Sequence, residues 1–281
     1  MGTDKTGLEI LAGMIYEYCG IDYRKDPLSL QSKIDSKLKE LGLSPWEYCG
    51  YLRVEPNEWD KLIELITINE TYFFREENLL EEFKTVILPQ YKDRTTENPL
   101  RIWSAACSTG EEPYTIMMLI EDSALFKAGA VQIIASDINK KVLNIAKNGV
   151  YKKKSLSFRR MPAGAYEKFF IELDEDFKVK DSIRNMIDFR HINLLDSNIK
   201  DKIQNVDIIF CRNVFIYFDN SAIKKIINTF YDILNPGGYL FLGHAETITS
   251  LHKGFETILT SSVYYYRKRG GHHAAIRSAC G

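Results

Sequence analysis

Three common sequence signals are missing from this chain of 281 residues, and each absence excludes a class of protein. Its five cysteines include no C-x-x-C pair, so neither a disulfide framework nor a zinc site is expected. No apolar run approaches the ~20 residues of a membrane span, and no basic-then-apolar leader begins the sequence. The formal net charge of −1 shows no broad basic excess of the kind that favours nucleic-acid binding. We therefore expect a cytoplasmic protein that binds neither metal nor nucleic acid and does not insert into membranes.

The G-x-G-x-x-G fingerprint of dinucleotide-binding folds is also absent, yet a strand, a turn and a helix follow one another here. Residues 100–106 are apolar and partly β-branched, which is typical of a buried parallel strand. The small residues 107–110 end this strand, and Pro113 suits the first turn of the following helix. A helix N-terminus, with its unpaired N–H donors, then lies at the carboxyl edge of a sheet. This pattern predicts a site for a nucleotide cofactor.

A second strand and helix repeat the pattern and supply an acidic residue. Residues 131–135 read as a strand that ends in Ser136 and Asp137, and residues 139–147 read as a helix closed by Gly149. Asp137 lies 27 positions after Gly110, near the roughly 20-residue spacing at which a carboxylate accepts hydrogen bonds from ribose hydroxyls. The alternative is that Gly110 only marks an ordinary strand-to-helix turn.

The chain divides into four expected parts. Residues 1–76 form an N-terminal helical domain, with helices at 7–19, 28–41, 45–52 and 58–68. A linker helix (77–91) and a polar loop occupy residues 77–99 and lead to an α/β domain at 100–267. Residues 268–281 lack an apolar pattern and are expected to be a disordered tail.

The α/β domain continues as alternating strands and helices, which favours a doubly wound parallel sheet. Residues 206–211 read as a strand and 221–234 as a helix, and residues 236–238 turn the chain into a strand at 239–243. The runs 255–260 and 263–267 are separated by two serines and read as a hairpin, so one closing strand should be antiparallel. An antiparallel closing strand distinguishes the methyltransferase form of this sheet from the dehydrogenase form.

Residues 151–185 are too long and too polar for a simple connection. They contain a basic run at 152–154 and alternating residues at 170–180, and a further sheet strand follows at 186–192. We expect an inserted, mostly β subdomain, which is a common place for partner binding.

Five segments occur in a fixed order along the chain and are followed by a sixth. They are NETYFFRE (69–76), RIWSAACSTGEEPY (101–114), ASDIN (135–139), INLLD (192–196) and CRNVFIYF (211–218), with GGYLFLGHAE (237–246) after them. Together they closely resemble the chemotaxis receptor methyltransferases of the CheR family, over roughly residues 7–267 and including the domain order. The resemblance implies the Rossmann-like sheet of S-adenosylmethionine-dependent methyltransferases. It further implies transfer of methyl groups to glutamates of methyl-accepting chemoreceptors, with S-adenosylhomocysteine as the second product.

The resemblance also assigns cofactor contacts to particular residues. Asn69, Thr71 and Arg75 are implied to close over the cofactor from the linker side. Glu112 is implied to hold the methionine ammonium group and Asp137 the ribose. A glutamate in the first turn of a helix is otherwise a simple dipole-stabilising residue, so both readings of Glu112 stay open.

Further implied contacts come from the two later segments. Asn193 and Leu194 are implied to flank the adenine, and Arg212 and Asn213 to line the methionine end. Asn193 could equally be a turn former. The aromatic residues 72–74 would by default be core, or they could shield the sulfonium from water.

Arg75 and Tyr217 are the residues that the resemblance implies for the transfer step. A glutamate acceptor is already ionised at neutral pH, so the chemistry needs no general base. Proximity, orientation and exclusion of water should dominate, with Arg75 and Tyr217 holding the acceptor carboxylate. The structural alternatives are a surface ion pair of Arg75 with Glu76 or Glu77, and a packing role for Tyr217.

An acidic receptor segment requires positive charge on the enzyme, and two surfaces offer it. They are Lys33, Lys37 and Lys39 on the second expected helix and the basic run at 152–154, although a charge run is often only a solvated surface. We expect a monomer. The alternative functions are a related methyltransferase acting on another protein or a small molecule, and a non-catalytic module that only binds the cofactor.

Overall fold

The computed structural model describes residues 5–270 of the chain. Most of the expected tail, residues 271–281, therefore lies outside the described residues. At its start, Lys268 still belongs to a strand, and the Arg269 N–H donates to the Gly254 carbonyl oxygen at 2.9 Å. The expectation that the tail begins at residue 268 is therefore wrong for these first residues.

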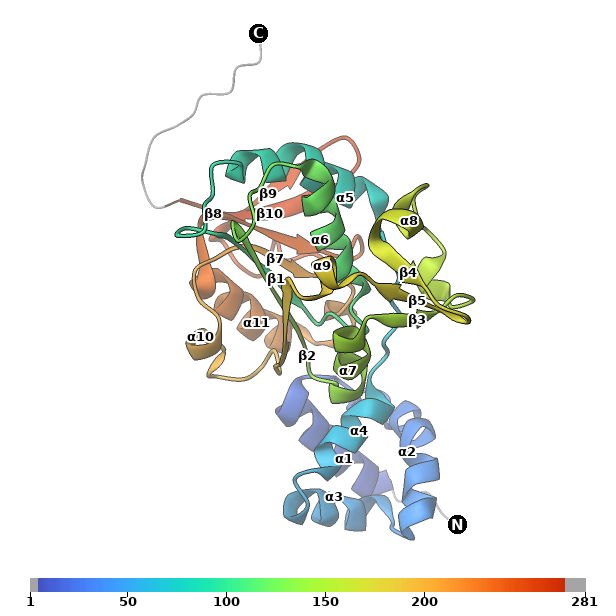
Figure 1. The fold of residues 1–281 in the computed structure, drawn as a ribbon. Coiled ribbons are helices and arrows are strands. Elements are labelled where there is room, and N and C mark those ends of the chain that lie inside the picture. The colour runs from blue at the N-terminus through green and yellow to red at the C-terminus, as the bar shows by residue number, and fades with distance from the viewer. Residues whose placement is uncertain (1–4, 271–281) are drawn as a thin grey trace.

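A seven-stranded sheet with the order β6-β2-β1-β7-β8-β10-β9 forms the centre of the molecule (Figure 1). The pairs from β6 to β8 are parallel, and β10 is antiparallel to both β8 and β9. This order confirms the expected α/β class and its antiparallel closing strand. The strands are β1 (Leu100–Ala105), β2 (Val131–Asp137), β6 (Ile187–His191), β7 (Val206–Cys211), β8 (Leu234–Leu242), β9 (Phe255–Leu259) and β10 (Tyr264–Lys268).

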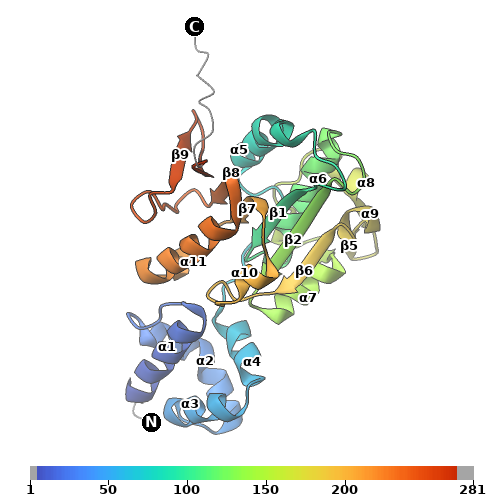
Figure 2. The ribbon, with the colours of Figure 1, turned by 90° about the vertical axis from the view of Figure 1, so that its left-hand side faces the viewer.

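Helices cover both faces of the sheet because successive strand residues point to opposite sides. In β1, Leu100 and Ile102 join one hydrophobic core, whereas Trp103 and Ala105 join the other. Figure 2 shows α11 on one side of the sheet and α6 on the opposite side. The covering helices are α6 (Glu111–Ser123) and α7 (Lys140–Asn148) on one face, and α10 (Ile199–Lys202) and α11 (Asn220–Ile233) on the other.

The first four helices pack around a core of their own below the sheet (Figure 1). Asp26 caps α2 by accepting from the Ser29 N–H, and Ser44 and Glu47 form a reciprocal capping box at the start of α3. The last of these helices ends two residues earlier than expected, because Thr67 adopts an extended backbone. The four are α1 (Lys5–Cys19), α2 (Pro27–Leu41), α3 (Pro45–Val54) and α4 (Glu58–Ile66).

The connection from these helices to the sheet is a single rod, as expected, but its hydrogen-bond pattern changes along its length. It begins as α5 (Glu77–Glu82), widens into a π-turn at Phe83–Ile87 and tightens into a 3₁₀ turn at Leu88–Tyr91. Its buried side chains Phe83, Ile87 and Leu88 pack on the same sheet face as α6.

The segment at residues 236–238 does not turn the chain before a strand, because β8 already begins at Leu234. The register between β7 and β8 shifts between Val206 and Ile208, which accommodates these residues inside the strand. A Cβ atom on Gly238 would lie 2.7 Å from the Asp207 carbonyl oxygen. The glycine therefore permits a close approach of two strands.

The expected inserted β subdomain is present, although helical turns occupy at least as much of the segment as strands do. Three short strands, β3 (Val150–Lys152), β5 (Asp176–Val179) and β4 (Phe170–Glu172), form an antiparallel sheet in that order. Aromatic packing holds it to the rest of the chain. The helical turns are η3 (Leu156–Phe158), α8 (Ala165–Phe169) and α9 (Asp181–Arg184).

Phe73, from the segment that connects α4 to α5, joins this aromatic packing from outside the insertion. Its fully buried ring lies 5.1 Å from Tyr151, 5.4 Å from Phe158 and 5.2 Å from Phe170, measured between ring centroids. The Phe73 N–H also donates to the Ser157 carbonyl oxygen at 2.9 Å. The insertion therefore fixes the chain between the helical unit and the sheet.

Candidate functional site

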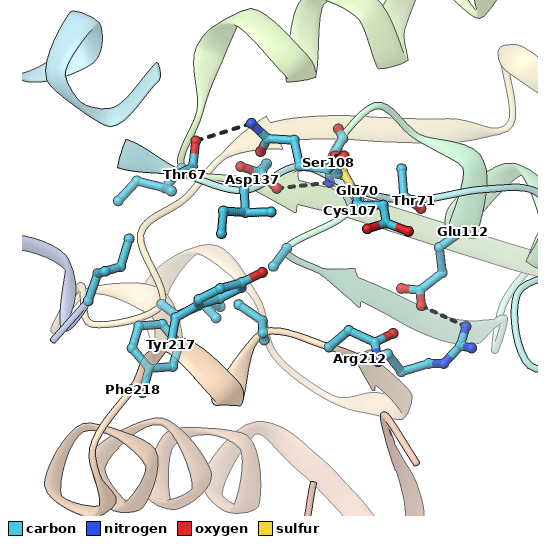
Figure 3. Close-up of a pocket in the computed structure, with 18 of the residues that line it drawn as sticks. Thr67, Glu70, Thr71, Cys107, Ser108, Glu112, Asp137, Arg212, Tyr217 and Phe218 are labelled. Carbon is cyan, nitrogen blue, oxygen red and sulfur yellow. Dashed lines mark hydrogen bonds and ion pairs between the residues drawn. The ribbon is translucent and has the colours of Figure 1, made fainter. Parts of the chain in front are cut away.

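A pocket of about 1130 Å³, counted out to its open mouth, lies at the carboxyl ends of β1, β2, β6 and β7. Residues 67–72 and Arg75, which follow α4, form its opposite wall. Figure 3 shows Asp137, Glu112, Arg212 and Tyr217 around this space. All ten residues expected at the site line the pocket: Asn69, Thr71, Arg75, Glu112, Asp137, Asn193, Leu194, Arg212, Asn213 and Tyr217.

The turn from β1 to α6 forms the floor of the pocket. Ala106, Ser108 and Gly110 have positive φ angles of 59°, 50° and 96°, and such angles in non-glycine residues are uncommon and concentrate at functional sites. A Cβ atom on Gly110 would lie 2.8 Å from the Cβ of Ala146 in α7. The close packing of α6 against α7 therefore explains the single glycine.

Asp137 ends β2 and points into the pocket with both carboxylate oxygens anchored. Oδ2 accepts from the Ser108 N–H and Oδ1 from the Asn139 N–H, each at 2.8 Å. Burial raises the pKa of Asp137, and these two backbone donors oppose that increase. Each oxygen keeps a further lone pair, so the carboxylate is held in place and can still accept hydrogen bonds from a diol.

Glu112 and Glu76 share one arginine at the other end of the pocket. Arg212 donates from Nη1 to Glu112 Oε2 at 3.0 Å, and its Nη2 lies 3.1 Å from Glu76 Oε2. Burial raises the pKa of Glu112 although Arg212 opposes the shift. Burial acts in the same direction on Glu76, but Arg212, His244 and Asn213 outweigh it and lower the pKa of Glu76. Arg212 therefore stabilises the charged form of Glu76 more than that of Glu112. A second cation beside Glu112 would stabilise the charged form of Glu112.

One donor nitrogen of Arg212, its Nε, is unused in this arrangement. Its Nη2 also donates to the Arg75 carbonyl oxygen at 2.6 Å, but its Nε is buried and has no partner among the described residues. A buried donor without a partner is costly, and a ligand oxygen would relieve that cost.

The linker residues form the wall opposite the sheet. Asn69 donates to Thr67 Oγ1 at 3.2 Å, and its carbonyl oxygen accepts from Ser108 Oγ at 3.0 Å. Among residues 5–270, Arg75 forms no ion pair with Glu76 or Glu77, and its Nη1 donates to the Glu70 carbonyl oxygen at 3.1 Å. The structural alternative for Arg75 is therefore not observed, and its guanidinium lines the pocket.

The aromatic residues beside Arg75 have different environments. Phe73 and Phe74 are buried in the core, whereas Tyr72 is partly exposed and lines the pocket. Only Tyr72 of these three can therefore shield a ligand.

Tyr217 lies in a single 3₁₀ turn, η4 (Phe215–Tyr217), after β7. Burial raises the pKa of its phenol, with Arg75 opposing the shift, so the hydroxyl is neutral near pH 7 and can donate a hydrogen bond. Asn213, in the preceding turn, has a φ of 60° and donates weakly to Glu76 Oε1 at 3.4 Å.

Of the two residues expected beside adenine, Asn193 makes hydrogen bonds within the fold, whereas Leu194 presents an apolar surface. Asn193 donates through Nδ2 to the Tyr18 carbonyl oxygen and accepts from the Leu195 N–H at 3.0 Å, so its side chain acts as a turn former. Leu194 is buried and presents an apolar surface to the pocket.

Glu246 is a further important residue that the sequence did not reveal. Its carboxylate is buried and accepts from three backbone N–H groups: Gly243 at 2.7 Å, Asn213 at 2.9 Å and Phe215 at 2.7 Å. It fixes the loop that carries Arg212, Asn213 and Tyr217. Its signals were its place at the end of the segment GGYLFLGHAE (237–246) and its position shortly after a buried strand, and neither distinguishes it from an exposed glutamate.

Both basic surfaces expected to meet an acidic partner are largely compensated by acidic neighbours. They present less net positive charge than the sequence suggests, and their pairs are mostly exposed and individually weak. The pairs are Lys37–Glu40, Lys39–Asp35, Lys152–Asp176 and Lys153–Glu172, with N···O distances of 3.3, 2.5, 3.0 and 2.6 Å.

The described part of the chain contains neither a candidate metal site nor a candidate membrane-spanning helix. Within residues 5–270, no group of three or more His, Cys, Asp or Glu side chains is placed to hold a metal ion. None of the helices in this range is long and apolar enough to cross a membrane.

The strand order and the pocket at the carboxyl ends of the parallel strands define an S-adenosylmethionine-dependent methyltransferase. Residues 69–264 match the family described as "CheR methyltransferase, SAM binding domain". The chain therefore belongs to the CheR methyltransferase family, and its cofactor is S-adenosylmethionine.

Similar proteins come from several bacteria. A chemotaxis protein methyltransferase of Borreliella burgdorferi is 35% identical over 271 residues, which cover 92% of this chain and 93% of that protein. The chemotaxis protein methyltransferase of Escherichia coli is 32% identical over 268 residues, covering 92% and 90%. Chemotaxis protein methyltransferase 2 of Vibrio cholerae is 35% identical over 229 residues, covering 80% and 79%.

Proposed function

We propose that this protein methylates glutamate side chains of methyl-accepting chemoreceptors and so forms glutamyl methyl esters during chemotactic adaptation. The observation that carries the proposal is the convergence of Arg75 and Tyr217 with the cofactor-side residues in one pocket. The relatives are named chemotaxis protein methyltransferases, which agrees with a chemotaxis protein as acceptor.

The chemistry of the pocket residues fits S-adenosylmethionine. Asp137 offers two anchored carboxylate oxygens to the ribose diol. Glu112 offers a carboxylate to the methionine ammonium group, and the unpartnered Arg212 Nε suits the methionine carboxylate. Leu194 provides an apolar surface beside the adenine, and Asn69 and Thr71 complete the linker wall.

The chain's own residues act by orientation and exclusion of water. S-adenosylmethionine supplies a methyl group on a positively charged sulfur. Ester formation makes one O–CH₃ bond and breaks one S–CH₃ bond, so a negative and a positive charge cancel. Arg75 and Tyr217 hold the acceptor carboxylate so that one oxygen lone pair faces the methyl group. Tyr72 lines the same pocket and limits water there.

The remaining parts of the proposal concern organisation and partners. We assign residues 1–76 to a helical domain, 77–99 to a linker, and 100–267 to the methyltransferase domain with its insertion at about 151–185. The acceptor is the cytoplasmic methylation region of a receptor, so the protein acts in the cytoplasm, and we propose that it does so as a monomer.

The decisive experiment incubates the protein with methyl-labelled S-adenosylmethionine and receptor-containing membranes. Label on receptor glutamates that base releases as methanol is the expected result. Base-stable label would indicate another acceptor group. Absence of label with a folded protein that binds the cofactor would favour a non-catalytic module.

A matched pair of arginine variants tests the transfer residues. Arg75→Ala should reduce the transfer rate by about 100-fold, the scale expected when an oriented contact is lost. Arg184→Ala removes an arginine that pairs with Asp181 at 3.0 Å in the insertion, away from the pocket, and should leave the rate unchanged. Equal rates for the two variants would remove Arg75 from the transfer step.

A further inference from the structure

The turn that carries Tyr217 is anchored on both sides, and the two anchors come from distant parts of the chain. On its upstream side, Glu246 accepts from the Phe215 N–H at 2.7 Å. On its downstream side, residues between α1 and α2 pair with its backbone. The Asp22 N–H donates to the Tyr217 carbonyl oxygen at 3.0 Å, and Ile21 and Phe218 form an isolated antiparallel bridge.

Side chains reinforce the downstream anchor. Asp219 caps α11 by accepting from the Ala222 N–H at 2.8 Å, and its carboxylate also accepts from the Tyr16 hydroxyl at 3.0 Å. Arg24 donates to Asp219 at 3.0 Å and to Asp22 at 2.8 Å. The guanidinium of Arg24 lies 3.3 Å from the centre of the Tyr16 ring. Arg24 thus joins the α1–α2 loop to the residue two positions after Tyr217.

The backbone is closely packed at the same place. Gly20 has a φ of +80°, and a Cβ atom there would lie 2.8 Å from Leu195 Cδ1 and 3.2 Å from Phe218 Cδ1. The loop therefore has little freedom to move relative to the turn, and any shift of the loop is transmitted to it.

We propose that the α1–α2 loop, through Arg24, positions Tyr217 for methyl transfer, so that the helical unit contributes to the rate of the reaction. A one-turn 3₁₀ helix makes few hydrogen bonds of its own, and the Tyr217 N–H donates to the Val214 carbonyl oxygen at 3.2 Å. Its geometry consequently depends on the flanking anchors. Arg24 is a positioning residue, since it reaches Tyr217 only through Asp22 and Asp219. The inference rests on the proposed role of Tyr217 in transfer.

The test compares Arg24→Met with Lys25→Met. Methionine keeps most of the apolar stem, and Lys25 is an exposed neighbour whose Nζ lies 3.9 Å from Asp22, so both variants remove one positive charge from the same loop. Arg24→Met should lower kcat by about 5- to 20-fold, within the range expected for a misplaced group. It should change the Kd for S-adenosylmethionine less than about twofold, and Lys25→Met should change neither.

A double-mutant cycle with Tyr217→Phe separates positioning from a general structural effect. Because Tyr217→Phe removes the hydroxyl that Arg24 positions, Arg24→Met should have less than about a twofold effect on kcat in that background. A similar decrease in both backgrounds, or equal effects of Arg24→Met and Lys25→Met, would overturn the proposal. Tyr16→Phe removes a single hydroxyl and provides a milder second variant, expected to show the same dependence on Tyr217.

A spectroscopic readout keeps this inference distinct from the proposed function. With 3-fluorotyrosine at position 217, Arg24→Met should shift or broaden the ¹⁹F resonance, whereas Lys25→Met should not. If the wild type failed to methylate receptors but Arg24→Met still shifted the resonance, the proposed acceptor would be wrong. The positioning of Tyr217 by Arg24 would still be supported. An unchanged resonance in Arg24→Met would contradict the positioning directly.

Discussion

Glu112→Gln is the most informative single substitution, because Glu112 is both the partner of Arg212 and the proposed partner of the cofactor's ammonium group. Glutamine keeps the shape and can still accept from Ser104 Oγ, which lies 2.7 Å from Glu112 Oε1. Loss of one buried ion-pair partner alone costs ~3–5 kcal/mol of stability. Arg212 retains Glu76 at 3.1 Å, so the free energy of unfolding should fall by less than this.

The substitution should also weaken ligand binding. A hydrogen bond to a charged group contributes ~1.5–3 kcal/mol, which corresponds to an increase of about 10- to 150-fold in the Kd for S-adenosylhomocysteine. Isothermal titration calorimetry measures this directly. The analogue 5′-methylthioadenosine lacks the ammonium and carboxylate groups, so its Kd should change little in the variant.

Glu111→Gln is the matched control, because Glu111 is the neighbouring buried carboxylate and accepts from Thr109 Oγ1 at 2.6 Å and Ser157 Oγ at 2.8 Å. It does not line the pocket, so it should alter stability and leave S-adenosylhomocysteine binding unchanged. If Glu112→Gln weakened both ligands equally, Glu112 would act only through the fold. If it weakened neither, the assignment of the ammonium site would be refuted.

Three further predictions concern pH, the Glu246 carboxylate and the Phe73 ring. Because burial raises the pKa of Glu112, this carboxylate should take up its proton at a higher pH than an ordinary glutamate and lose its attraction for an ammonium group as pH falls. The Kd for S-adenosylhomocysteine should therefore rise on acidification in the wild type and remain flatter in Glu112→Gln; parallel curves would contradict this. Glu246→Ala leaves three backbone N–H groups without their acceptor, and each costs ~1–3 kcal/mol. The free energy of unfolding, measured by urea denaturation, should therefore fall by at least ~3 kcal/mol. A fall below ~1 kcal/mol would argue against the anchoring role of Glu246. Phe73→Ala should cost ~3–5 kcal/mol as a core cavity, whereas the partly exposed Tyr72→Ala should cost less; equal losses in thermal denaturation would contradict the packing described.

The position of one pocket residue, Asp137, followed from a local sequence pattern. Asp137 was found because a strand, a turn and an acidic residue at a suitable spacing place a carboxylate at the edge of a parallel sheet. Its two anchoring N–H donors come from the adjacent turns, Ser108 and Asn139. The resemblance to the family then supplied Arg212 and Tyr217, which no spacing rule would have singled out.

Features that depend on distant contacts were not predictable in the same way. Two of the three contacts of Glu246, with Asn213 and Phe215, lie on a loop about 30 residues earlier in the chain. The sequence of residues 236–238 is typical of a turn, but these residues lie inside β8. The pairing between β7 and β8 shifts to accommodate them, and this shift exists only in the folded sheet. The insertion was read as mostly β from its alternating residues, although packing around Phe73 determines much of its structure.

The aromatic packing around Phe73 has a consequence for exchanging the insertion between relatives. Tyr151, Phe158 and Phe170 belong to the insertion, but their shared partner lies outside it, next to the residues that form the pocket wall. A chimera that replaced residues 151–185 would replace all three rings that contact Phe73. Phe73 would then pack against side chains from the other protein. Chimeras that exchange residues 69–76 together with the insertion should retain cofactor binding, whereas exchange of the insertion alone should weaken it. The unit of exchange in this protein is therefore discontinuous in sequence.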